Sequence, residues 1–277
     1  MTGSQHWRRY LIICLPLAII ATLLTVFFAA PGMPPGNQTD VAAGQVIDNT
    51  VFFGMSAFIA VMILGYLLYV GLVFRERQPE LGLEGPRVRG DARIQAWWLF
   101  STTIIVLFLA AYGSIRLLED GSGGGQGPKP IAFVPDASHA LQVQVIAQQW
   151  KFTYRWPGYG GVETNSLELP ANTPVEFHVT SLDVIHSFWA YQLGVKADAN
   201  PGFDNVAYAT TRSPFSFYIE CAELCGLWHG YMHEEGSVVP KAQWSAWIKQ
   251  QETTNAAITK TLPPYSTRYF PQPQRRA

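Results

Sequence analysis

The chain has 277 residues, of which 48% are hydrophobic and only 14% are charged, and its formal net charge is -1. This balance excludes a strongly basic nucleic-acid-binding protein and a disordered acidic tail. Because the apolar residues are concentrated toward the N-terminus, a membrane is the first environment that the composition indicates.

Three apolar runs at the front of the chain are each long enough to cross a bilayer hydrocarbon core of about 30 Å. They lie near residues 10–30, 51–74 and 96–118. One such run alone also fits a buried core helix, but three in succession favour membrane spans. We therefore predict a transmembrane region over residues 1–120.

Arginines set the orientation of these spans. The loop from Arg75 to Arg93 carries five arginines, and short arginine-rich loops stay in the cytoplasm. Everything after Leu118 is then extracytoplasmic, and we expect a multi-pass protein of the bacterial plasma (inner) membrane. The first run is longer than the apolar region of a signal peptide, which has about 7–15 residues. Phe28 also stands where a small residue would precede a cleavage site after Ala30. We therefore expect a retained helix, with a cleaved leader as the alternative.

The rest of the chain divides by composition into a Gly/Pro-rich linker at 121–135, a globular domain at 136–252 and a proline-containing tail at 253–277. Short apolar or alternating pieces, separated by Pro, Gly and Asn turns, predict an antiparallel β-sandwich or barrel. These pieces are residues 141–146, 152–156, 175–180, 187–191 and 215–219. Helical periodicity returns only at 241–249, so we expect a terminal helix there.

One stretch of this domain, from Cys221 to Met232, collects two thiols, an imidazole and a thioether. These soft and borderline donors suit copper better than hard cations. Gly226 and Gly230 each cost a helix about 1 kcal/mol, so a shaped loop between strands is expected. Two thiolates this close suit two bridged metals, while a disulfide and a zinc site are the alternatives. The remaining cysteine, Cys14, lies in the first apolar run and is expected to be a buried bystander.

The Cys221–Met232 block resembles the binuclear copper loop of cytochrome c oxidase subunit II, and the segment from Asp183 to Trp189 resembles that family's other ligand segment. The resemblance implies a cupredoxin-like domain with two copper ions in a CuA centre. Matching motif positions implies copper ligands at His186, Cys221, the Glu223 carbonyl, Cys225, His229 and Met232. It further implies that the Glu223 carboxylate helps to bind Mg or Mn at the contact with subunit I.

The resemblance also implies a function within a haem-copper cytochrome c oxidase, an oxidoreductase and translocase. Such a subunit takes electrons from cytochrome c, or from a haem c subunit, and passes them to subunit I, where oxygen is reduced to water and protons are pumped. Haem is therefore expected only on partner subunits, and this chain has no Cys-x-x-Cys-His attachment motif. A membrane-anchored copper carrier or sensor without a catalytic partner is the alternative.

Residues 148–154 resemble the family's aromatic segment, which implies that Trp150 receives the electron; an aromatic residue packed in the sandwich is the alternative.

His178 is expected to be structural or exposed rather than a ligand. Members of the family often carry a glutamate at the mouth of a proton path, three residues before a tryptophan. Aligning Trp98 with that tryptophan places Gln95 at the glutamate position, and a glutamine side chain cannot titrate. A docking patch for a basic cytochrome is a further hypothesis, built from Asp183, Asp198, Asp204 and Glu220.

Overall fold

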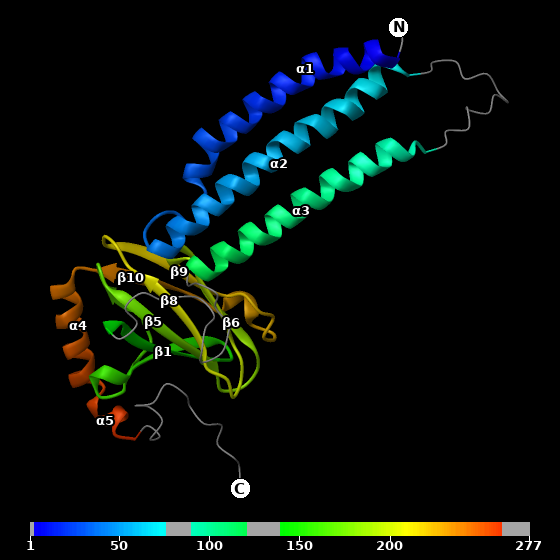
Figure 1. The fold of residues 1–277 in the computed structure, drawn as a ribbon. Helices are drawn as coiled ribbons and strands as arrows, with labels where there is room; N and C mark the ends of the chain where they lie inside the picture. The colour runs from blue at the N-terminus through cyan, green and yellow to red at the C-terminus, as the bar shows by residue number, and fades with distance from the viewer. Residues whose placement is uncertain (1–2, 76–89, 121–138, 262–277) are drawn as a thin grey trace. The chain divides into compact units, whose positions relative to one another are not determined.

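A computed structural model of the chain describes residues 3–75, 90–120 and 139–261 (Figure 1). The chain forms two compact units, one made of Met1–Met33 and Ile47–Ser114, the other of Pro34–Val46 and Ile115–Ala277. The predicted linker at 121–135, the end of the predicted tail and the middle of the arginine-rich loop lie outside the described residues. The two units are described separately below.

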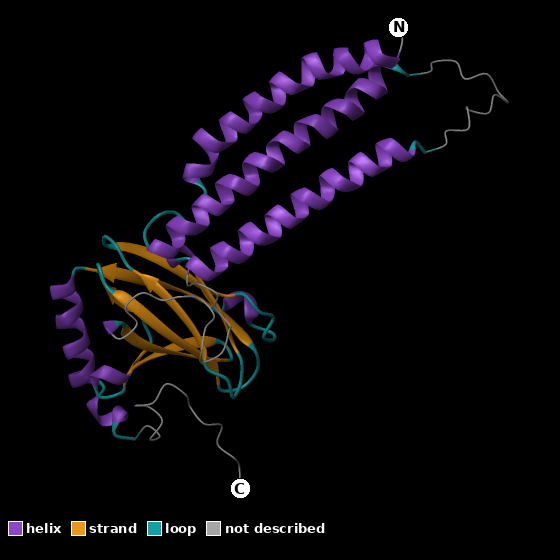
Figure 2. Ribbon diagram, viewed as in Figure 1, coloured by secondary structure: helices purple, strands orange, loops and turns teal. Residues whose placement is uncertain are grey.

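The first unit is helical (Figure 2). Its helices are α1 (Gly3–Leu24), which a π-helical turn at Thr25–Ala29 extends, α2 (Asp40–Val73) and α3 (Ala92–Asp120). By length and composition, three helical stretches are able to cross a membrane: Gly3–Gly32, Asp40–Val73 and Ala92–Leu118. The three predicted spans thus coincide with three long apolar helices, although α2 begins eleven residues before the predicted second run.

Helices α1 and α2 contact each other closely. The Tyr10 hydroxyl donates a hydrogen bond to the Met62 carbonyl at 2.6 Å. A Cβ placed on Gly65 would lie only 2.7 Å from the Cys14 sulfur, so glycine permits this approach. Cys14 is buried at 6% exposure and occupies a helix contact within this unit.

The second unit is a β-sandwich of two five-stranded sheets (Figure 2). One sheet has the order β3-β2-β1-β5-β8 and the other has the order β4-β10-β9-β6-β7. The strands of the first sheet are β1 (Leu141–Gln148), β2 (Lys151–Trp156), β3 (Val162–Thr164), β5 (Pro174–Ser181) and β8 (Asn205–Thr210). Those of the second are β4 (Glu168–Pro170), β6 (His186–Ala190), β7 (Val195–Ala199), β9 (Phe215–Cys221) and β10 (His233–Val239).

Side-chain alternation places the core between the two sheets. Along β9, for example, Phe217 and Ile219 are buried while Tyr218 and Glu220 are exposed, as the period of two of a strand requires. Phe188 of the second sheet contacts aromatic rings of the first, including Phe177 at a centroid distance of 5.8 Å. The predicted fold class, N-terminal apolar helices followed by a β-sandwich, is confirmed.

The expectation of a purely antiparallel sandwich is wrong, because β1 pairs with β5, and β4 with β10, in parallel. Partners of this kind are separated by other strands in the chain, so no tight hairpin joins them. The terminal helix α4 (Lys241–Thr254) runs five residues past the predicted end, with Trp244 and Ile248 buried, and the short α5 (Ala256–Thr259) follows.

The start of α2 is part of the sandwich unit. The Thr39 hydroxyl, fully buried, accepts the N–H of Ala42 at 2.9 Å and donates to the Leu193 carbonyl at 2.8 Å. Asp40 Oδ1 accepts the N–H of Thr210 at 2.7 Å. Ala42 fills the place that a Cβ on Gly194 would occupy, 2.9 Å from the Ala42 nitrogen. Thr39 therefore caps the N-terminus of α2.

Candidate metal centre

Three neighbouring strands of the second sheet bring the predicted ligand residues to one place. Strand β6 begins at His186, β9 ends at Cys221, and β10 begins at His233, directly after Met232. The N–H of Cys221 donates to the Met232 carbonyl at 3.0 Å, and the N–H of Ala222 donates to the carbonyl of Ser187, the second residue of β6, at 2.9 Å. These bonds close the loop that joins β9 to β10 against β6.

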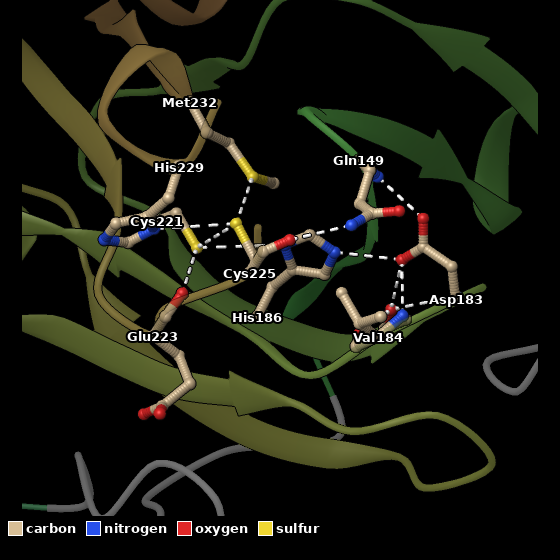
Figure 3. Close-up of polar contacts among 10 residues, drawn as sticks. Gln149, Asp183, Val184, His186, Cys221, Glu223, Cys225, His229 and Met232 are labelled. Carbon is tan, nitrogen blue, oxygen red and sulfur yellow. Dashed lines mark hydrogen bonds and ion pairs between the residues drawn. The ribbon is translucent and has the colours of Figure 1, made fainter. Parts of the chain in front are cut away.

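The two cysteine sulfurs lie side by side, and each of the other four predicted donors lies beside one of them (Figure 3). Cys221 Sγ lies 3.7 Å from Cys225 Sγ, 3.8 Å from His186 Nδ1 and 3.2 Å from the Glu223 carbonyl oxygen. Cys225 Sγ lies 3.5 Å from His229 Nδ1 and 3.9 Å from Met232 Sδ. The sulfurs are too far apart for a disulfide, whose S–S bond is about 2.05 Å long.

The centre is shielded from solvent. His186 is fully buried, and Cys221, Cys225 and Met232 are exposed by 8%, 3% and 2%. Burial raises the pKa of Cys221, but hydrogen bonds from His186 and from nearby backbone outweigh it and lower this pKa to about 6. Burial and the neighbouring Cys221 sulfur raise the pKa of Cys225 to about 12. One thiolate thus forms readily, and the second needs a cation to stabilise it.

The donor set fits a pair of copper ions. Sulfur and nitrogen donors on one tetrahedral ion, at bond lengths of about 2.0–2.3 Å, are about 3.3–3.8 Å apart, and the spacings above fall close to that range. Six donors exceed the four positions of one tetrahedral ion, whereas two ions that share both sulfurs use them all. The thioether of Met232 favours copper over zinc. The roles of the individual residues as ligands remain predictions.

Glu223 offers two groups that face different ways. Its backbone carbonyl lies beside Cys221 Sγ, while its side-chain carboxylate points away from the sulfurs and is exposed (Figure 3). The carboxylate is therefore free of the sulfur cluster and accessible to a hard cation.

Trp150 lies against the ligand loop and is half-buried. A Cβ on Gly226, at φ +121°, would come within 3.4 Å of the Trp150 indole nitrogen, so glycine lets the ring approach the residue that follows Cys225. The indole N–H is buried and has no hydrogen-bond partner among the described residues. The ring packs against the core and also contacts the ligand loop, while its role in electron transfer stays a prediction.

The hypothesis of a four-residue acidic patch is wrong for one of its members, Asp204. Asp204 is buried and lies 2.8 Å from His178 Nδ1, and Asp183 is tied to His186 and to the backbone of Gln149. Both carboxylates are already used within the chain. Asp183, Asp198 and Glu220 are exposed, so a docking role for these three stays a prediction. His178 lies on β5, away from the sulfur cluster.

Two residues of the centre were not recognised from the sequence as neighbours of the ligands. Gln149 donates from its side chain to the Cys225 carbonyl at 2.8 Å, and Asp183 lies 2.9 Å from His186 Nε2. The position of Asp183, three residues before His186, was an available signal, whereas the contact of Gln149 with residue 225 required the fold.

Comparisons with known proteins match much of this chain to cytochrome c oxidase subunit II proteins. Residues 164–235 match the family of the cytochrome c oxidase subunit II periplasmic domain. Relatives called cytochrome c oxidase subunit 2 include proteins from Bacillus sp. (strain PS3), 27% identical, and Synechocystis sp., 24% identical. The matched regions cover 67% of this chain and 52% of the Bacillus protein, and 94% of this chain and 89% of the Synechocystis protein.

The resemblance to cytochrome c oxidase subunit II is confirmed. A probable cytochrome c oxidase subunit 2 from Rickettsia bellii is 26% identical, with 73% of this chain and 77% of that protein covered. Among solved structures, the periplasmic domain of subunit II of the Bradyrhizobium japonicum cytochrome oxidase has 28% identity and a TM-score of 0.42, covering 44% of this chain and 99% of that domain.

These relatives are named as subunits of an oxidoreductase complex. The chain spans about half the length of the Bacillus relative. Three apolar helices and a match to a periplasmic domain indicate a membrane-anchored protein with an extracytoplasmic domain. The family and the buried cluster of His186, Cys221 and Cys225 indicate a copper centre.

Proposed function

We propose that this chain is the subunit through which electrons enter a haem-copper cytochrome c oxidase of the bacterial plasma membrane. The observation that supports this best is the gathering of six donors from two chain segments around two sulfurs 3.7 Å apart. A copper pair held there would supply reversible one-electron chemistry. No haem-attachment motif is present, so haem and oxygen reduction belong to partner subunits.

The chain's own residues contribute rigidity, burial and contact. Cys221, Cys225, His186 and His229 hold the metals, while Met232 and the Glu223 carbonyl complete the set. Because three hydrogen-bonded strands anchor the loop, its geometry changes little between redox states, which favours fast transfer. Trp150 is proposed to receive the electron from cytochrome c or a haem c subunit, and subunit I is proposed to take it onward.

Metal analysis and electron paramagnetic resonance of the full-length chain in detergent test this proposal. We expect two coppers per chain and a seven-line hyperfine pattern, because one electron is shared by two equivalent nuclei. A four-line pattern, which a single copper gives, or zinc as the bound metal in carefully prepared protein, would contradict it.

Trp150→Gln tests the proposed electron acceptor. Copper absorption should stay unchanged, because the indole supplies no donor atom, while reduction by cytochrome c should slow. Trp247→Gln, which alters a half-buried ring that contacts Trp156 from α4, is the matched control. Equal reduction rates in wild type and Trp150→Gln would dismiss the role of Trp150.

The Glu223 carboxylate is proposed to bind Mg or Mn together with ligands from subunit I. It is exposed and turned away from the sulfurs, and oxygen donors suit hard cations. Glu223→Gln should remove bound Mn from the purified complex but keep the copper spectrum, since the copper-side donor is the backbone carbonyl. Retained Mn would assign the site to other residues.

A further inference from the structure

We propose that Asp183 and Gln149 are positioning residues that join both ligand segments, and the turn that carries Trp150, into one hydrogen-bonded unit. The proposal rests on the copper centre proposed above. Neither side chain supplies a donor to the six-member set, so their action is indirect. Hydrogen bonds connect His186 to Asp183, Asp183 to Gln149, and Gln149 to Cys225 (Figure 3).

Asp183 fixes the ring of His186. Its Oδ1 lies 2.9 Å from His186 Nε2, and the same oxygen accepts the N–H of Val184 at 2.7 Å. A carboxylate acceptor keeps the ring proton on Nε2 and so leaves the lone pair on Nδ1, which faces Cys221 Sγ at 3.8 Å. Asp183 therefore sets both the orientation of the ring and the nitrogen that is available to a metal.

The second oxygen of Asp183 connects this ligand to another strand. Asp183 Oδ2 accepts the backbone N–H of Gln149 at 2.8 Å, in the turn between β1 and β2. The carboxylate of Asp183 thus has charge-assisted hydrogen bonds to the Gln149 backbone and to His186. Charge-assisted bonds of this kind are stronger than neutral ones.

Gln149 completes the connection to the cysteine loop. Its side-chain Nε2 donates to the Cys225 carbonyl at 2.8 Å. A Cβ on Gly226 would lie 2.9 Å from that nitrogen, so the close approach depends on glycine at this position. Trp150 follows Gln149 directly and contacts the same glycine. The turn at Gln149 and Trp150 thus has three connections to the centre. The Gln149 backbone binds Asp183, which binds His186; the Gln149 side chain binds the Cys225 carbonyl; and the Trp150 ring contacts the loop backbone at Gly226.

Substitutions at the two positions should weaken the centre by different routes. Asp183→Ala removes both acceptors. Asp183→Asn keeps the shape and can still accept from His186, but its NH₂ group cannot accept from Gln149. Gln149→Ala leaves the backbone bond to Asp183 intact and removes only the side-chain bond to Cys225. We expect copper affinity to fall in the order wild type, Asp183→Asn, Asp183→Ala, with Gln149→Ala also below wild type.

The experiment is a copper competition titration of the metal-free, full-length chain in detergent against a chelator of known affinity. Loss of a residue that orients a metal ligand typically costs about 10–100-fold in affinity, and we expect Asp183→Ala to fall in that range. Asp198→Asn, on the exposed side of β7, and Gln148→Ala, beside Gln149, are matched controls and should bind copper as wild type does.

A spectroscopic readout separates positioning from general destabilisation. With His186 loosened, the two coppers become unequal, so the hyperfine pattern of Asp183→Asn should lose its regular seven lines while the melting temperature of the metal-free protein stays unchanged. Wild-type affinity and spectrum in Asp183→Ala, Asp183→Asn and Gln149→Ala would overturn the inference and leave the proposed function standing. A wild-type chain that binds no copper pair would overturn both. If Asp183→Ala fails to fold, the isosteric Asp183→Asn and the independent Gln149→Ala decide.

Discussion

Two buried histidines in the sandwich share one feature and differ in another. His186 on β6 and His178 on β5 are exposed by 0% and 5%, and each has one ring nitrogen within 2.9 Å of an aspartate oxygen. The other nitrogen of His186 faces the sulfur of Cys221, whereas that of His178 faces the Glu176 carboxylate at 3.5 Å. The group opposite the second nitrogen therefore distinguishes a ligand candidate from a structural histidine.

The second carboxylate beside His178 determines the protonation state of that histidine. Burial lowers the pKa of His178, but Asp204 and Glu176 outweigh it and raise this pKa to about 9. His178 is then protonated at neutral pH and has no lone pair for a metal. Tyr208 also donates to Glu176 at 2.8 Å, so the cluster is a charged, hydrogen-bonded group that packs against no thiolate.

The largest expected effect is on copper content. Cys225 is the central donor, because its sulfur lies within 3.9 Å of Cys221, His229 and Met232. Cys225→Ser should reduce bound copper from two ions to one or none and abolish the paired-copper signal. His178→Gln should change neither. Metal analysis with electron paramagnetic resonance measures both, and a copper loss in His178→Gln would break the distinction between the two histidines.

The next effect is the pH dependence of stability at the His178 cluster. Because folding raises the pKa of His178 from 6.5 to about 9, its stabilisation is fully present below pH 6.5 and is lost as the pH rises through 9. The lost contribution is about 3 kcal/mol. Burial raises the pKa of Glu176, but hydrogen bonds with His178 and Tyr208 outweigh it and lower this pKa. The stabilisation from Glu176 is therefore lost only in acid, as the pH falls through the lowered pKa.

Thermal unfolding of the full-length chain in detergent, followed by tryptophan fluorescence between neutral and alkaline pH, measures this effect. The difference in melting temperature between wild type and His178→Gln should shrink as the pH rises through about 9. A constant difference over that interval would show that His178 is not charged in the folded protein.

The smallest effect compares two glycines within the ligand loop. Gly226 has φ +121° and its Cβ position is blocked by Gln149, whereas no atom lies within 4 Å of a Cβ on Gly230. Gly226→Ala should therefore cost about 1–3 kcal/mol, and Gly230→Ala less than about 0.5 kcal/mol. Melting temperatures of the two variants measure this, and equal losses would show that the loop adapts to a side chain at either position.

Sequence reasoning reached the helices, the sandwich and the grouping of donors, because long apolar runs, strand alternation and the Cys221–Met232 spacing are local signals. It missed β3 and β4, since three residues are too few for alternation to show, and it also missed β7 and β8. It also assigned Asp204 to the surface, although that residue is buried, and it did not find the partners of Asp183 and Asp204. Their partners include Gln149, 34 positions from Asp183, and His178, 26 positions from Asp204, so only the fold reveals them.

The contacts of Thr39 and Ala42 bear on how the sandwich can be isolated. A soluble fragment that begins at residue 139 would lack this segment, so the Leu193 carbonyl would lose the Thr39 hydroxyl and the space beside Gly194 would open to water. A fragment that carries residues 34–46 at its front, joined to the sandwich by a short peptide, would keep the edge covered. Redox potentials measured on the shorter fragment would then describe a domain whose surface at Leu193 and Gly194 is exposed to solvent.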